Sequence, residues 1–100
     1  MADAKKERYR RIRGLILKLL VYVHPKTMDP LTLMKLLDDL DYRITEDELD
    51  SYIDYLEEKK LVEVIERKGN GVRLKMVKIS PRGIDVLDGE SETGIDVCGL

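Results

Sequence analysis

Residues 45–83 have the sequence TEDELDSYIDYLEEKKLVEVIERKGNGVRLKMVKISPRG, and this stretch decides the fold. Thr45 and Glu48 have the spacing of a capping box, which predicts the start of a helix that ends near Lys60. Four apolar positions at helical spacing are expected to face the core: Leu49, Tyr52, Ile53 and Leu56. The first part of the stretch is therefore an amphipathic helix with a well-marked beginning.

The remainder of the stretch predicts a β-hairpin followed by a short helix. Two runs rich in Val and Ile, at 61–68 and 72–80, are joined by Gly69-Asn70-Gly71, and Asn-Gly between strand formers is a strong hairpin signal. The apolar alternation is interrupted at Met76-Val77, where we expect a bulge or the end of the strand. Ser80-Pro81 supplies an N-cap and a proline at the first position of a final helix.

Two helices are predicted upstream of this stretch, at Ala4–Val23 and from Asp29-Pro30 onward. The buried face of the first is expected to carry Tyr9, Ile12, Leu15, Ile16, Leu19, Leu20 and Val23. The buried stripe of the second is expected to carry Leu33, Leu36, Leu37 and Leu40. The final helix should end at Asp88, so residues 1–88 form one domain and 89–100 a disordered acidic tail.

This order of elements is that of an α+β winged helix, with three core helices, a two-stranded hairpin wing and a short C-terminal helix. The chain from Lys5 to Asp88 resembles winged helix-turn-helix regulators of the MarR, ArsR and PadR type, chiefly in Thr45–Leu61 and in Ile79–Ile84. Such regulators commonly leave the wing through an Ile/Leu-Thr/Ser-x-x-Gly step. The ending Gly83–Val97 is also similar to small uncharacterised winged-helix proteins of Mu-like prophages. The resemblance implies a fold more directly than a function.

Composition and motifs favour a soluble, cytoplasmic protein without catalytic chemistry. Apolar residues make up 43% of the chain, yet no apolar run is long enough to cross a bilayer. The single histidine, His24, and the single cysteine, Cys98, cannot form a closed zinc site, and Gly69-Asn70-Gly71 lacks the ending of a phosphate loop. We therefore expect no enzyme activity, no metal and no cofactor. The absence of Gln, together with abundant Lys, Arg and Glu, is typical of thermophile proteins.

The net charge of −2 conceals two basic segments separated by an acidic one. The first basic segment contains Lys5, Lys6, Arg8, Arg10, Arg11 and Arg13, and the second contains Arg67, Lys68, Arg73, Lys75 and Lys78. Between them lies the acidic segment of Glu46, Asp47, Glu48, Asp50, Asp54, Glu57 and Glu58. The outer face of the third helix, with Asp47, Asp50, Asp54 and Glu58, therefore opposes reading of the DNA major groove.

Two functions remain open. The first is nucleic-acid binding in regulation, through double-stranded DNA contacts from the N-terminal arginines and the wing: Arg8, Arg10, Arg11, Arg13, Arg67, Lys68, Asn70, Arg73 and Lys75. The alternative is a protein-interaction module whose acidic third helix docks on a basic partner through Asp47, Asp50, Asp54 and Glu58. The arrangement of charge separates them: DNA is favoured if the two basic segments share one face, and a protein partner is favoured if the acidic helix lies between them.

The first helix has a second apolar face, formed by Leu17, Val21 and Tyr22. An exposed face of this kind commonly marks a contact, so we expect a symmetric homodimer through this helix. The alternative is that the wing strands or the final helix cover the face within one chain.

Overall fold

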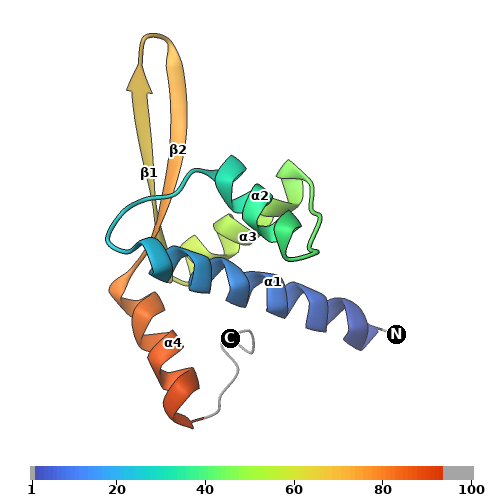
Figure 1. Cartoon of the computed structure of the whole chain (residues 1–100). Helices are drawn as coiled ribbons and strands as arrows, with labels where there is room; N and C mark the ends of the chain where they lie inside the picture. The colour runs from blue at the N-terminus through green and yellow to red at the C-terminus, as the bar shows by residue number, and fades with distance from the viewer. Residues whose placement is uncertain (1, 94–100) are drawn as a thin grey trace.

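The computed structural model describes residues 2–93, and the side chains of residues 5–89. Its elements follow the predicted order: α1 (Ala2–Val23), α2 (Pro30–Asp39), α3 (Glu46–Glu58), β1 (Val62–Gly69), β2 (Val72–Ile79) and α4 (Pro81–Thr93). The hairpin of β1 and β2 stands away from the helices, while α4 leaves its base on the opposite side (Figure 1). This arrangement confirms the predicted winged helix. No helix in the described range combines the length and apolarity that crossing a membrane requires.

Side-chain caps begin three of the helices, as the sequence predicts. The Asp29 carboxylate accepts a hydrogen bond from the backbone N–H of Thr32 at 3.2 Å and caps α2. The Thr45 hydroxyl accepts from the Glu48 N–H at 3.1 Å and caps α3. Each cap satisfies a backbone donor that would otherwise have no partner at the start of a helix.

The Ser80 hydroxyl joins the start of α4 to the end of α3. It accepts a hydrogen bond from the Gly83 N–H at 3.1 Å and donates one to the Lys60 carbonyl at 2.7 Å. Ser80 is itself 6% exposed, so both bonds lie in a largely dry environment. The predicted N-cap is therefore confirmed, and it also fixes α4 against the turn that precedes β1.

The hairpin turn has the conformation that its residues predict. Asn70 and Gly71 have φ values of 50° and 77°, and the turn joins the paired residues Gly69 and Val72. Two positive φ values in a two-residue loop match the twist of the adjoining strands. The backbone conformation thus gives Asn70 a structural role in the turn.

The expected irregularity at Met76-Val77 is wrong, because the strand register is continuous from one end of the hairpin to the other. Val77 pairs with Val64 on one side and with Met28 on the other. The Met28 N–H donates to the Val77 carbonyl at 2.7 Å, and the Val77 N–H donates to the Met28 carbonyl at 2.9 Å. The segment around Met28 therefore covers β2 near the base of the hairpin, which explains why the apolar Val77 departs from the alternating pattern.

The core lies where α1, α2, α3 and the base of the hairpin meet. The predicted stripe of α3 is confirmed, since all four of its apolar side chains are buried. In α2, Leu33 and Leu37 are buried and Leu36 is partly buried, whereas Leu40 is 46% exposed and does not belong to the core. The predicted stripe of α2 therefore ends one turn early, because Leu40 is already the C-cap.

The buried side of α1 is rotated from its predicted position. Its fully buried residues are Ile12, Ile16, Leu17 and Leu20, whereas Tyr9 is 40% exposed and Leu15, Leu19 and Val23 are only partly buried. Leu17 was expected on an exposed dimer face, but it is 1% exposed. Both β2 and α4 pack against α1, which is the alternative left open above, so Leu17 is unavailable to a second copy. Val21 is partly buried, and Tyr22 remains 90% exposed.

The final helix is longer than predicted. It continues past Gly89, where the acidic tail was expected to begin, and ends at Thr93. Residues 94–100, including Cys98, lie outside the described residues. The partly buried side chains of Ile84, Val86 and Leu87 hold the first part of α4 against the core.

Candidate functional site

The tip of the wing carries three exposed cations, Arg67, Lys68 and Arg73, here called the wing-tip cations. Lys68 and Arg73 are cross-strand partners and therefore lie on the same face of the hairpin. None of the three forms an ion pair or a side-chain hydrogen bond within residues 2–93. Their charge is thus directed to solvent.

Lys75, nearer the base of the wing, is differently placed. Its ammonium Nζ lies 4.0 Å from the carboxylate Oδ1 of Asp54 on α3. Lys78 likewise lies 3.6 Å from Glu63 across the hairpin. The sequence predicts one uniform basic wing, whereas the structure divides it into an unpaired tip and a base that is paired with acids.

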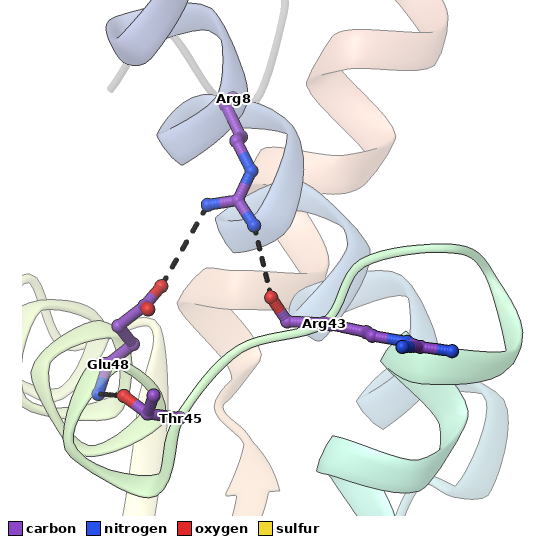
Figure 2. A network of polar contacts seen from close by, with 4 residues as sticks. All are labelled: Arg8, Arg43, Thr45 and Glu48. Carbon is purple, nitrogen blue, oxygen red and sulfur yellow. Dashed lines mark hydrogen bonds and ion pairs between the residues drawn. The ribbon is translucent and has the colours of Figure 1, made fainter.

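Arg8 and Arg13 of α1 are directed toward α3. Arg8 donates a hydrogen bond to the Arg43 carbonyl at 3.1 Å and lies 3.8 Å from the Glu48 carboxylate (Figure 2). The Arg13 guanidinium is centred 4.3 Å from the ring centroid of Tyr55, a cation–π contact. Two of the four arginines assigned to DNA therefore hold α1 against α3.

The remaining N-terminal cations are exposed on the surface of α1. Arg11 lies 4.0 Å from Glu7 one turn away, in the (i, i+4) arrangement of a weak helical ion pair. Lys5, Lys6 and Arg10 are exposed and form no ion pair with the described residues. Of the N-terminal residues, these three are the ones most available to an external anion.

The outer face of α3 is acidic over its whole length. Its exposed residues are Asp47, Asp50, Ser51, Asp54 and Glu58, and we call this set the acidic face. One flank of α3 meets α1 through Glu48, and another meets the wing through the ion pair of Asp54. The acidic helix therefore lies between the two basic segments, as the protein-partner alternative requires.

A groove opens beside this helix, bordered by the start of α2, the first half of α3 and strand β2. Its volume is about 280 Å³, and its apolar lining consists of Pro30, Leu31, Met34, Leu49 and Leu74. The exposed fractions of Leu31 and Leu74 are 65% and 53%, whereas Leu49 is buried beneath them. Sequence reasoning missed this groove, although Leu31 lies outside the apolar stripe of α2 and could have indicated an exposed leucine.

The rim of the groove is charged. Asp29, Glu46 and Asp50 supply three carboxylates, and Lys75 supplies one ammonium group. The Thr32 hydroxyl donates a hydrogen bond to Asp29 and holds the pKa of that carboxyl below its usual value. Asp29 is therefore ionised at neutral pH, and the rim carries three acidic side chains against one basic side chain.

A second hollow, of about 330 Å³, lies between α1 and α3 and is lined by three tyrosines, Tyr9, Tyr52 and Tyr55. The ring centroids of Tyr9 and Tyr52 are 6.1 Å apart. The Tyr52 hydroxyl is buried and has no hydrogen-bond partner in the described structure. Burial, followed by the negative charge of Glu48, raises the pKa of the Tyr52 phenol. The sequence predicts only that Tyr52 is a core residue.

Within residues 2–93, no group of three or more His, Cys, Asp or Glu side chains is arranged to hold a metal ion. His24 is exposed at the end of α1. The candidate site consists of the wing-tip cations, the exposed cations of α1, the acidic face and the groove beside it.

Comparisons with known proteins identify the architecture. No family model and no curated protein matches the sequence. Among solved structures, a PadR-like transcription factor from Bacteroides fragilis superimposes with a TM-score of 0.78 at 19% identity, over 94% of this chain and 88% of that one. A PadR-family regulator from Eggerthella lenta gives 0.73 at 20% identity, over 91% and 78% of the two chains. The fold is that of a PadR-like winged helix.

A third solved structure of this fold was determined with nucleic acid. The Bacillus subtilis PadR in complex with operator DNA superimposes with a TM-score of 0.64 at 12% identity, over 76% of this chain and 44% of that protein. The structures that the chain resembles are thus transcription factors and regulators rather than enzymes. At these identities the likeness concerns the fold alone.

Proposed function

We propose that the chain is a DNA-binding transcription regulator that contacts the DNA backbone through its wing. The observation that carries this proposal is the set of wing-tip cations, which are exposed and unpaired at the end of a projecting hairpin. Phosphate contacts of this kind supply most of the electrostatic affinity of DNA-binding proteins. The PadR-like fold, which includes one protein solved on operator DNA, supports the same reading.

In this proposal the acidic face does not enter the major groove. A phosphate about 4 Å from a carboxylate costs about 1 kcal/mol even in water, and several such pairs would oppose binding. Among the N-terminal residues, Lys5, Lys6 and Arg10 are better placed than Arg8 and Arg13 to reach a phosphate, since the latter two already contact α3. Binding should therefore depend strongly on salt and weakly on sequence.

The test is fluorescence anisotropy with two short DNA duplexes of unrelated sequence, titrated over a range of salt concentrations. The double variant Lys68→Ala/Arg73→Ala should weaken binding to both duplexes equally, because phosphate contacts carry little sequence information. The slope of log affinity against log salt should fall by about two units, one for each lost contact. Converting Asp47, Asp54 and Glu58 to Asn or Gln should leave binding unchanged or strengthen it.

Arg82→Ala is the matched control, because Arg82 is an exposed cation in the first turn of α4. This helix begins at the base of the hairpin, away from the wing tip (Figure 1). It should alter neither affinity nor slope. Absence of DNA affinity at low salt, or an unchanged slope in the double variant, would contradict the proposal.

A second candidate function is docking of a basic protein surface on α3. The position of α3 between the two basic segments favours it, because a duplex that spans both would face the acidic face. Under this alternative, the same neutralisation of Asp47, Asp54 and Glu58 abolishes binding of the partner, and the wild-type protein has no measurable DNA affinity. Neutralising these three acids thus separates the two functions, because it preserves or strengthens DNA binding under the first and abolishes partner binding under the second.

A further inference from the structure

The groove between α2, α3 and β2 combines exposed leucine side chains with a concave shape. Leu31 and Leu74 are more than half exposed, although both line the same concave site together with Met34. Single exposed leucines are common on protein surfaces, but exposed apolar side chains gathered in a hollow mark a place of contact. Nothing in the described chain fills this hollow.

The charges around the groove specify the chemistry of an occupant. Glu46 and Asp50 are exposed and have no ion-pair partner among the described residues, and Asp29 adds a third carboxylate. Lys75 is the rim's single cation, and it already lies 4.0 Å from Asp54. A phosphate or a carboxylate entering the groove would meet this negative rim, whereas lysine or arginine side chains would find unpaired acceptors.

We propose that this groove is the docking site for a basic amphipathic segment of another protein, which places large apolar side chains between Leu31 and Leu74 and lysine or arginine beside Glu46 and Asp50. The inference goes beyond the proposed DNA-binding function and does not depend on it, because none of the wing-tip cations that carry that proposal lines the groove. It adds an apolar anchor to what would otherwise be a purely electrostatic contact. Because buried apolar side chains dominate interface energies while exposed ion pairs contribute little, the groove rather than the acidic face determines affinity.

The test uses a short synthetic helical peptide with leucine at positions i and i+4 and with lysine and arginine flanking them. A matched peptide of the same charge carries serine in place of both leucines. Titration of the isotope-labelled full chain, followed by two-dimensional NMR, should show shifts at Leu31, Met34 and Leu74 with the leucine peptide. The serine peptide should bind at least about tenfold more weakly, since it lacks both apolar side chains that the groove would bury.

The protein variants give a second, independent comparison. Leu31→Ser/Leu74→Ser should reduce affinity for the leucine peptide at least about tenfold, whereas Leu40→Ser should not, because Leu40 is a similarly exposed leucine outside the groove. Glu46→Gln/Asp50→Asn should weaken binding and reduce its dependence on salt. All substituted residues are exposed, and retained dispersion of the NMR spectrum verifies the fold of each variant.

Four results would overturn the inference. Equal binding of the leucine and serine peptides would show a charge contact only. If Asp54→Asn/Glu58→Gln abolishes peptide binding while Leu31→Ser/Leu74→Ser does not, the second candidate function survives but the groove is not its site. Shifts at the groove that depend on protein concentration without peptide would assign it to a second copy. Shifts at the same residues on addition of a DNA duplex would assign it to nucleic acid.

Discussion

Gly83→Ala tests the junction between the wing and α4, where Gly83 lies close to the backbone of Leu61. A Cβ atom at Gly83 would lie 2.3 Å from the Leu61 carbonyl oxygen and 2.7 Å from Cγ1 of Ile79. That carbonyl cannot easily move, because it accepts a hydrogen bond from the Ser80 N–H at 3.0 Å. Alanine would favour the helix by about 1 kcal/mol, but overpacking against fixed neighbours costs about 1–3 kcal/mol, and more against backbone. We expect a net loss of about 1–2 kcal/mol in the free energy of unfolding.

The matched control is Gly89→Ala in the same helix, where a Cβ atom would have no neighbour within 4 Å. Here only the helix propensity changes, so the free energy of unfolding should rise by up to about 1 kcal/mol. Urea denaturation followed by circular dichroism measures both variants, and equal slopes for all three proteins would show that midpoints report stability. A Gly83→Ala variant as stable as the wild type would refute the steric reasoning and the assigned approach of α4 to Leu61.

Three further comparisons test other parts of the structure. Thr45→Ala removes the cap of α3 and should lower the free energy of unfolding by about 1 kcal/mol. Asp54→Ala breaks one exposed ion pair and should lower it by less than about 0.5 kcal/mol. Equal losses in urea denaturation would contradict the assigned start of the helix. Leu17→Ala should cost about 2–5 kcal/mol because the side chain is buried. Of the face expected to form a homodimer, Tyr22 is the residue that remains fully exposed, so Tyr22→Ser should leave stability unchanged and, if that face is the interface, yield a monomer by sedimentation. A dimer that persists would place the interface elsewhere. Tyr52→Phe should leave the free energy of unfolding unchanged or raise it by about 1 kcal/mol, because it removes a buried hydroxyl without a partner. The wild-type protein should lose stability as pH rises above 10.0, because its buried phenol resists ionisation in the folded state, and the variant should lack this loss. Clear destabilisation of the variant at neutral pH would reveal a partner for the hydroxyl.

Local signals in the sequence predicted the structure correctly wherever one short segment determines its own conformation. Thr45 and Ser80 mark helix starts because a side-chain oxygen near the first free N–H groups is favourable in any fold. Asn70-Gly71 determines the turn because both residues tolerate positive φ. Together with the Asp29-Pro30 cap and the apolar spacing of the first three helices, these signals predicted the order of the elements and the winged-helix fold.

Features that depend on distant segments could not be predicted in this way. Leu17 is buried in a fold in which α2, β2 and α4 all pack against α1, and contacts between such distant segments cannot be inferred from the local sequence. The regular strand at Val77 depends on Met28, which lies far earlier in the chain. The groove requires Leu31 and Leu74 to meet across the tertiary fold, so the sequence indicated the acids of the candidate site but not its apolar part.

The acidic residues of α3 differ in their effect on the stability of the helix. Glu46, Asp47 and Glu48 lie in the first turn, where negative charge stabilises the positive end of the helix dipole. Glu58 lies at the opposite end, where the same dipole disfavours a carboxylate, and it has no ion-pair partner among residues 2–93. Helix stability therefore accounts for the first three acids but not for Glu58. The charge at the end of the acidic face opposes both helix stability and phosphate binding, so whichever ligand the protein binds, α3 is better suited to face cations than the DNA backbone.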